Sequence, residues 1–490
     1  MNNIRRYWGI FGIAVVFFIF FYLRLYHLGF HDLWYDEAIT ARYAQYPWHG
    51  WNTPLHYILL IFWTKLFGIS EFSLRFPSLI FSFLSIIFVF LLGKKLFNKE
   101  IGLYASVIMG LCPFQLWYAQ EARDYSMMLF FGTLSTYLLY YALRERKIKF
   151  WLGFIFTSIL GMYSNYFFIF LVFAQALYVL VFFRRLRLGL RNIIPFLLVG
   201  VGFLPFLPRF LSKFFTVWRG FWIPQPNFGS LRITIENFIL GYNAHLLAYV
   251  FADILVIIFF IAAIIKFKNT DVRSGIIFCL FLFLGPIILA FLFSKIFFSV
   301  YIDRALIIAT PYFYLILSLG IAMVDRKLIK LFSTVVLCVL LFYGVIAYHN
   351  DWIFTPFEHH TGTYIKKPVR PLVEFIEDNL GSDDIFAFSN YCLIPSFSFY
   401  AKKKIPAYYF FDPKLLDPSW KIPLRETEFR VPLHKINDLR FKTLWLLASN
   451  WARNEGLCEN STAVKDWLDN NFKLKFSEEF YGSWILSYER

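Results

Sequence analysis

Two adjacent carboxylates, Asp36 and Glu37, lie in the segment Leu33-Trp34-Tyr35-Asp36-Glu37-Ala38, just after a hydrophobic stretch long enough to cross a bilayer. Charged side chains beside a membrane are usually retained because they perform a task. A positioned carboxylate can act as a general base that takes the proton of an attacking hydroxyl group. Asp36 is therefore a candidate catalytic base. Glu37 is a second acidic candidate, which can instead orient the loop or pair with an arginine.

Three further polar clusters occur between the hydrophobic segments. They are Asn52-Thr53-Pro54-Leu55-His56-Tyr57, Gln120-Glu121-Ala122-Arg123-Asp124-Tyr125 and Tyr301-Ile302-Asp303-Arg304. Lipid headgroups solvate most interfacial charges, so each cluster alone has a simple structural explanation. With the helix order given below, however, all of them lie on the side of the membrane that carries Asp36, where topology requires no charge. Their common side favours a functional site over headgroup contact alone.

The elements that position these clusters are predicted to span a membrane. Of the 490 residues, 59% are hydrophobic and 16% are charged, whereas soluble proteins have about 25% charged residues. The net charge of +16 does not indicate a nucleic-acid partner, because residues 349–490 contain 18 Lys and Arg against 19 Asp and Glu. The basic excess therefore lies between the hydrophobic segments of residues 1–348, as the positive-inside rule requires.

About eleven transmembrane helices are predicted, and the N-terminus is expected in the cytoplasm. The spans are 8–26, 74–93, 101–118, 126–143, 151–165, 167–183, 193–211, 245–265, 275–297, 305–324 and 328–348. Residues 54–68 are apolar but short, so they are expected to lie along the membrane surface. The Lys- and Arg-rich loops then all fall on the cytoplasmic side; they are 94–99, 144–149, 184–191, 266–273 and 325–330. An odd number of spans places residues 349–490 outside the cytoplasm.

Residues 349–490 are predicted to form a separate α/β domain. A helix near 369–379 precedes strand-like runs at 385–388 and 443–447. The doublet His359-His360 is typical of a plain surface. Cys392 and Cys458 can pair if the domain is extracytoplasmic, although spacing alone does not decide the question. The chain has no glycine-rich phosphate motif, so no nucleotide site is predicted.

Taken in order, these motifs resemble the polyprenyl-phosphate-sugar-dependent transferases, which include the protein O-mannosyltransferases and the lipid A aminoarabinose transferases. The resemblance covers about residues 1–345. It rests on residues 33–38, 53–57, 67–68, 74–78, 118–125, 165–167, Gln175, Arg304 and 319–320. It implies a GT-C fold, in which a polytopic α-helical membrane domain with an acidic first outer loop is followed by an extracytoplasmic C-terminal domain. The implied location is the inner (cytoplasmic) membrane.

The resemblance also implies a reaction in which a sugar passes from a polyprenyl phosphate to a hydroxyl group, with inversion at the anomeric carbon. Asp36 takes the place of the catalytic acidic residue. The leaving lipid phosphate needs cations, and Arg binds phosphate in a bidentate manner. Arg123 and Arg304 are therefore the first candidates for donor binding, and Arg75 ranks below them. The other candidates for substrate contacts are Glu121, Asp124, Tyr125, Asn52, His56 and Tyr57.

Several alternatives stay open at this point. Relatives often carry His or Glu just before the Pro of the second motif, where this chain has Asn52-Thr53; a divalent metal is therefore an open alternative with no assigned ligand. The sugar is undetermined, and the acceptor can be a protein, a lipid or a glycan. A flippase or transporter of lipid-linked glycans is the main competing function, although transporters more often show internal repeats and polar groups at mid-membrane. A polymerase or ligase of surface polysaccharide would lack the acidic first loop.

The basic loops predict that a reporter fused after Arg490 lies outside the cytoplasm. A reporter enzyme that works only in the cytoplasm should be silent there, and a secreted phosphatase fused at the same point should be active. Activity of the cytoplasmic reporter would reverse the side assigned to Asp36 and to the other polar clusters.

Overall fold

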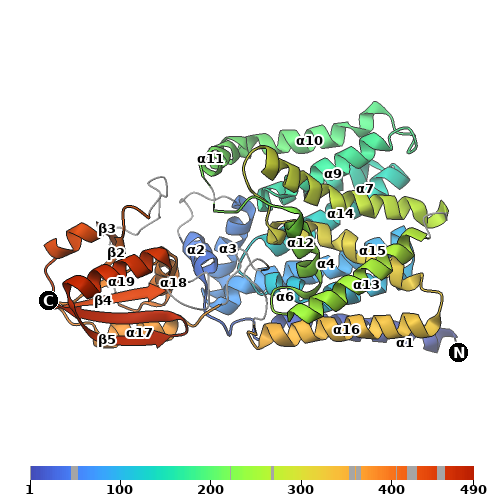
Figure 1. Cartoon of the computed structure of the whole chain (residues 1–490). Helices are drawn as coiled ribbons and strands as arrows, with labels where there is room; N and C mark the ends of the chain where they lie inside the picture. The colour runs from blue at the N-terminus through green and yellow to red at the C-terminus, as the bar shows by residue number, and fades with distance from the viewer. Residues whose placement is uncertain are drawn as a thin grey trace. The chain divides into compact units, whose positions relative to one another are not determined.

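The computed structural model describes residues 2–45, 53–220, 222–265, 270–352, 359, 366–403, 405–415, 428–449 and 458–490. The chain divides into two compact units, each described by itself (Figure 1). The first unit contains residues 1–28 and 47–361 and is helical. The second contains residues 29–46 and 362–490 and is built on a β-sheet.

The first unit consists of apolar helices whose inward-facing side chains form one large core. Its α-helices are α1 (Asn2–Leu25), α3 (Pro54–Phe67), α4 (Glu71–Leu96), α5 (Lys99–Leu111), α6 (Pro113–Ala119), α7 (Tyr125–Glu145), α8 (Ile148–Ser164), α9 (Phe168–Val181), α10 (Ile194–Phe203), α11 (Leu207–Trp218), α12 (Phe228–Leu240), α13 (Leu246–Ile265), α14 (Thr270–Ile296), α15 (Thr310–Ala322) and α16 (Lys327–His349). Short 3₁₀ helices are η1 (Leu190–Asn192), η2 (Leu204–Phe206) and η4 (Asp303–Ala309).

Within the described residues, seven helical stretches are long and apolar enough to cross a membrane, or eight if the bent pair α5 and α6 is one span. The seven are α4, α7, the stretch 190–218, α13, α14, the stretch 303–322 and α16. Three other predicted spans coincide with α1, α8 and α9, which are shorter apolar helices over their described lengths. The predicted polytopic helical fold is confirmed, and the number of eleven spans stays a prediction.

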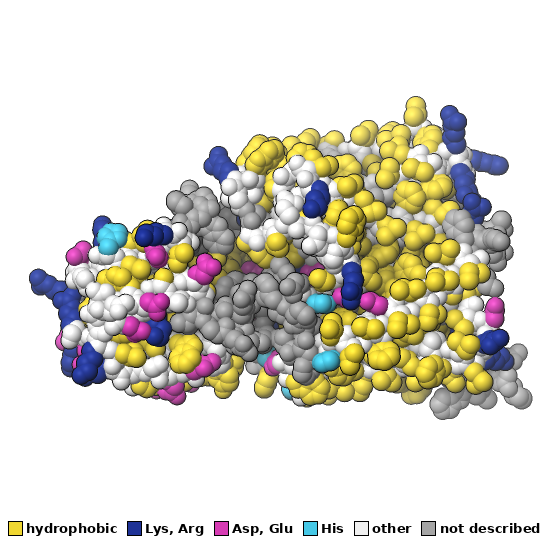
Figure 2. Space-filling model, viewed as in Figure 1, with side chains coloured by type: hydrophobic (Ala, Val, Ile, Leu, Met, Phe, Trp, Pro, Cys, Tyr) yellow, Lys and Arg dark blue, Asp and Glu magenta, His cyan; other side chains and the backbone are white. Residues whose placement is uncertain are grey.

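Hydrophobic side chains cover much of the outside of this unit. One face of α13 exposes Leu247, Phe251, Ile254 and Ile258, as expected of a helix that contacts lipid. Figure 2 shows hydrophobic side chains spread over the helical unit, with Lys and Arg gathered at the end where α9 connects to α10. That connection contains the predicted cytoplasmic loop 184–191.

A buried arginine donates hydrogen bonds to the backbone at the break between α5 and α6, where the chain bends by 63°. Pro113 has no N–H to donate to the carbonyl of Met109, four residues earlier. The Arg24 side chain of α1 donates instead to Met109 O at 3.1 Å and to Gly110 O at 2.9 Å. Carbonyls at membrane depth need such partners because lipid supplies none. Arg24 therefore fixes the helix pair that leads into the motif at residues 120–125.

The second unit contains a six-stranded sheet within the described residues, in the order β3-β2-β1-β4-β6-β5. The strands are β1 (Ile385–Phe388), β2 (Ala407–Phe411), β3 (Glu428–Pro432), β4 (Thr443–Ser449), β5 (Lys473–Phe480) and β6 (Ser483–Glu489). The first four are parallel, and β6 runs antiparallel to β4 and β5.

Alternate residues of the sheet pack against helices on its two faces (Figure 1). Phe386 and Phe388 join the cluster of α17 (Arg370–Asn379) and α18 (Ile394–Tyr400), whereas Ala387 joins that of α19 (Glu459–Asn471). The predicted α/β domain, its helix near 369–379 and its strands at 385–388 and 443–447 are confirmed.

The loop that follows α1 folds as part of this second unit. It leads into α2 (Tyr35–Gln45), which packs against α18. Asp32 caps the N-terminus of α17, because its Oδ2 accepts hydrogen bonds from the N–H groups of Val369 at 2.6 Å and Arg370 at 2.9 Å. The division predicted at residue 348 did not include this arrangement, in which residues 29–46 pack within the C-terminal unit.

We expect Arg24→Met to destabilise the protein. The apolar side chain fills a similar volume but leaves buried carbonyl groups of α5 without donors, at a cost of about 1–3 kcal/mol for each group. The Tm of the purified protein in detergent should fall by several degrees. Arg144→Met is the matched control, since Arg144 is exposed and donates to Tyr140 on its own helix. Equal Tm values for the two variants would contradict the role given to Arg24.

Candidate functional site

In the first unit, the turn between α6 and α7 holds the motif at residues 120–125. Gln120 anchors it: the side-chain amide nitrogen donates to Arg24 O at 2.9 Å and to Tyr26 O at 2.6 Å. The amide oxygen accepts from the hydroxyl of Tyr348 at 2.9 Å. The turn is therefore tied to the end of α1 and to α16, which gives the side chains that follow a fixed direction.

Arg123 and Arg304, the two leading candidates for donor binding, come from different elements and meet at one aromatic ring. The guanidinium carbon of Arg123 lies 6.0 Å from the centroid of the Tyr125 ring, and that of Arg304 lies 5.8 Å from the same centroid. Arg304 also lies 5.7 Å from the ring of Trp222, which is partly exposed. Two guanidinium groups near one ring place two candidate phosphate ligands in the same part of the unit. The sequence separation of 181 residues gave no sign of this convergence.

The acidic members of the same motif are buried. Glu121 and Asp124 expose only 1% and 4% of their surface. Burial raises the pKa of Asp124, against the opposing effects of Arg123 and of hydrogen bonds with Thr53 and Asn165. The motif thus links the start of α3, the α6–α7 turn and the α8–α9 turn.

His56 and Tyr57 are buried on α3, and their rings lie 5.6 Å apart. Burial, followed by the charge of Arg123, lowers the pKa of His56 to about 3. His56 is therefore a neutral imidazole next to Arg123 at neutral pH. The remaining candidate of this cluster, Asn52, lies outside the described residues.

Arg75 makes a structural contact. It is 1% exposed, and its Nη1 donates to the carbonyl oxygen of Leu28 at 3.1 Å. This bond joins α4 to the turn that follows α1. The structure therefore does not bring Arg75 to the ring of Tyr125 as it does Arg123 and Arg304.

In the second unit, Asp36 and Glu37 occupy the first turn of α2, and their surroundings differ. Asp36 is partly exposed, whereas Glu37 is fully buried. The Oε1 atom of Glu37 lies 3.6 Å from the ammonium nitrogen of Lys366, which is also buried. The sequence suggested that Glu37 orients the loop or pairs with Arg; one of its contacts is a lysine far along the chain, for which no local pattern exists.

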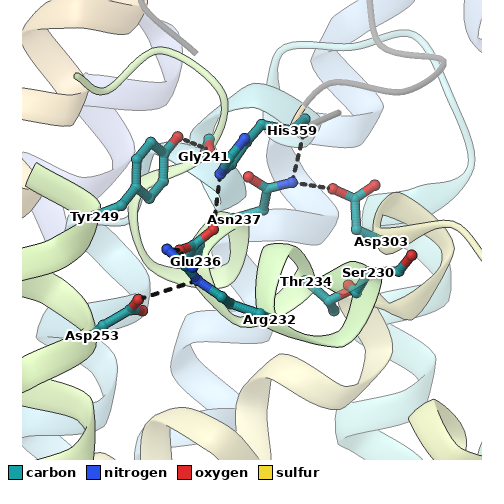
Figure 3. Close-up of polar contacts among 10 residues, drawn as sticks. All are labelled: Ser230, Arg232, Thr234, Glu236, Asn237, Gly241, Tyr249, Asp253, Asp303 and His359. Atoms are coloured by element: carbon teal, nitrogen blue, oxygen red, sulfur yellow. Dashed lines mark hydrogen bonds and ion pairs between the residues drawn. The ribbon is translucent and has the colours of Figure 1, made fainter. Parts of the chain in front are cut away.

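A polar network in the first unit was missed by the sequence analysis (Figure 3). Glu236 on α12 accepts hydrogen bonds from His359 Nε2 at 2.8 Å and from Arg232. The Nε atom of Arg232 also lies 3.7 Å from Asp253 Oδ2. Burial raises the pKa of Glu236, but the hydrogen bonds from His359 and Arg232 outweigh burial and hold the pKa below its ordinary value. His359 is 7% exposed, so the expectation of a plain surface residue is wrong.

The helix that carries this network is defined locally. The side chain of Asn227 accepts from the N–H of Ser230, whose hydroxyl accepts from the N–H of Asn227, so α12 begins with a capping box. The helix ends at Gly241, which has a φ of 65°. A side chain there would meet Pro113 and the backbone nitrogen of Phe114 at 3.1 Å, so glycine lets α12 approach the α5–α6 break.

The open alternative of a metal gains no ligand set from the structure. Among the described residues, no three His, Cys, Asp or Glu side chains come together in a way that could hold a metal ion. All five cysteines, including Cys392 and Cys458, are free thiols.

Comparisons with known proteins agree with this architecture. Residues 51–211 match the family model of dolichyl-phosphate-mannose-protein mannosyltransferase. No match was found among curated proteins. The fold is similar to that of ArnT from Cupriavidus metallidurans in the apo state, with a TM-score of 0.63 over 99% of this chain and 98% of that chain at 11% identity.

Two further solved structures share the fold. ArnT from Cupriavidus metallidurans bound to undecaprenyl phosphate matches with a TM-score of 0.62 over 98% of both chains, at 11% identity. The Archaeoglobus fulgidus oligosaccharyltransferase in the apo form matches with a TM-score of 0.51 at 10% identity, over 82% of this chain and 64% of that chain. The predicted GT-C fold and the resemblance to the polyprenyl-phosphate-sugar-dependent transferases are confirmed. Together they support a glycosyltransferase that uses a lipid-linked sugar.

Because Glu236 forms ion pairs, we expect the thermal stability of the protein to depend on pH in the acidic range. A carboxylate whose folded pKa lies below its ordinary value of 4.5 stabilises the fold above that pH, and the contribution is lost as the pH falls through the folded pKa. The Tm in detergent should therefore fall between about pH 5 and about pH 3, and Glu236→Gln should show a smaller fall. Glu145→Gln, which removes an exposed pair with Lys147, should follow the wild type. Identical pH profiles for all three proteins would contradict this role of Glu236.

Proposed function

We propose that the protein transfers a hexosyl or pentosyl unit from a polyprenyl-phosphate donor to a hydroxyl acceptor, with inversion at the anomeric carbon, on the extracytoplasmic face of the cell membrane. The observation that carries this proposal is the convergence of Arg123 and Arg304 on Tyr125 in a helical unit with the GT-C fold. The solved relative bound to undecaprenyl phosphate supports the class of donor.

The reaction is a single displacement. The oxygen of the acceptor hydroxyl forms a bond to the anomeric carbon while the bond from that carbon to the phosphate oxygen breaks. The electron pair of the broken bond stays on the leaving polyprenyl phosphate, and the hydroxyl proton passes to a carboxylate. Attack opposite the leaving group inverts the anomeric carbon.

The first unit provides the phosphate contacts in this proposal. A phosphate monoester gains charge as it leaves, so preorganised cations lower the barrier more than a proton donor would. Arg123 and Arg304 serve this purpose, because the faces of Tyr125 and Trp222 hold guanidinium groups in place. Neutral His56 adds no charge of its own beside Arg123. Glu121 and Asp124 hold the turn that presents the arginine.

The resemblance to the family assigns the role of base to Asp36. Asp36 is the partly exposed carboxylate of the pair and takes the acceptor proton. Glu37 forms a buried ion pair with Lys366, and this pair fixes the first turn of α2. A buried ion pair of this kind is costly to break, because removing one partner leaves the other charge uncompensated. The two adjacent acids therefore have different tasks.

The acceptor is a hydroxyl group of a protein, a lipid or a glycan. The basic loops favour an N-terminus in the cytoplasm and residues 349–490 on the opposite side. In the families that the chain resembles, that side is where lipid-linked donors are used without nucleotide.

The test of this function compares Asp36→Asn with Glu37→Gln in purified protein supplied with a polyprenyl-phosphate sugar. Asn keeps the shape of Asp but accepts no proton at neutral pH, so turnover should fall by about 10²–10⁴-fold while the donor KM changes little. Glu37→Gln should lower the Tm and cost less turnover in the folded fraction. If Asp36→Asn turns over at the wild-type rate, Asp36 is not the base.

A further inference from the structure

Arg304 depends on its neighbour Asp303 for its backbone position. The two residues begin η4, and the N–H of Arg304 donates to Asp303 Oδ1 at 2.7 Å. The charges of the Asp303 carboxylate and the Arg304 guanidinium also attract each other. The contacts that fix the Asp303 side chain therefore also influence the position of Arg304.

Asn237 holds the other oxygen of Asp303. Its side-chain nitrogen donates to Asp303 Oδ2 at 2.5 Å and to the carbonyl oxygen of His359 at 2.7 Å, so both amide hydrogens are used (Figure 3). Asn237 is fully buried on α12. The Asn237 side chain thus connects η4, which carries Arg304, with the backbone of His359.

The His359 end of this connection has further contacts. The His359 ring is hydrogen-bonded to Glu236, the residue that precedes Asn237 on α12, and it lies 5.0 Å from the ring of Tyr249. Asn237 therefore donates from a helix whose neighbouring side chain also holds His359.

We propose that Asn237 is a positioning residue for donor binding, which holds Asp303 and, through the hydrogen bond from the Arg304 N–H, sets the position of Arg304 relative to the phosphate of a polyprenyl-phosphate ligand. This inference rests on the function proposed above. Without Asn237, the Asp303 carboxylate keeps its hydrogen bond with Tyr242 but loses the amide donor at Oδ2, and it then competes more strongly with the phosphate for Arg304. A lost buried hydrogen bond to a charged group is costly, so the competition is effective.

Asn243 offers a matched control from the same part of the chain. It is also buried, at 2% exposure, and its side-chain nitrogen donates to a backbone carbonyl, that of Trp352, at 2.8 Å. Asn237→Leu and Asn243→Leu therefore remove the same kind of buried amide. Only Asn237 donates to Asp303 as well.

The experiment measures binding of undecaprenyl phosphate in detergent to the purified full-length protein, with the Tm recorded for each variant. Asn237→Leu should weaken binding about tenfold, as expected for one charge-assisted hydrogen bond, whereas Asn243→Leu should bind as the wild type does. Adding Asn237→Leu to Arg304→Ala should cause no further loss, because the asparagine acts through the arginine. If Asn237→Leu does not fold, Asn237→Ser keeps a donor too short to reach both acceptors and should show the same loss.

The outcomes separate this inference from the proposed function. If Arg304→Ala weakens binding but Asn237→Leu and Asn243→Leu both bind like the wild type, Asn237 is only a structural residue and the inference is wrong. Additive losses in the double variant would also overturn it, since Asn237 would then act independently of Arg304. If Arg304→Ala itself binds normally, the phosphate role of Arg304 fails, and the positioning role of Asn237 fails with it.

Discussion

The helical unit depends on one constraint, which is that backbone groups at membrane depth must find partners inside the protein. Pro113 breaks a helix at such a depth, and Arg24 supplies the missing donors to Met109 and Gly110. The backbone oxygen of Arg24 in turn accepts from Gln120, which anchors the turn before Arg123. Arg24, which is buried for structural reasons, therefore helps to position the turn that carries Arg123, a candidate for phosphate binding. Moving the break would displace the whole motif at residues 120–125.

Polar side chains deeper in the unit act as links between helices. The Gln175 amide nitrogen on α9 donates to Thr136 on α7 at 2.9 Å, and Thr136 in turn bonds the hydroxyl of Tyr312 on α15. All three are fully buried. A transporter would instead need polar groups that line a path at mid-membrane. The packing of these groups against one another favours a transferase over a flippase.

Local sequence patterns predicted the elements well, and contacts between distant residues poorly. Residues 385–388 form a short, continuous apolar run, so the strand could be predicted from four residues. The cap that Asp32 places on α17, by contrast, joins residues 337 positions apart, and no local signal marks it. The same holds for Lys366 with Glu37 and for His359 with Glu236. The residue types of the candidate site could be predicted from the sequence. The contact of Arg75 with Leu28 O and the approach of Arg123 and Arg304 to Tyr125 could not, because they depend on the fold.

The most direct test of the central claim is whether the purified protein releases polyprenyl phosphate. The protein would be reconstituted into vesicles with a panel of polyprenyl-phosphate sugars carrying labels on both the lipid and the sugar, together with detergent-extracted membranes as the acceptor source. The account predicts that one donor loses its sugar to an acceptor, that free polyprenyl phosphate appears in equal amount, and that Arg123→Ala abolishes both signals. Movement of the intact donor between leaflets, with no separation of the two labels for any donor in the panel, would contradict it.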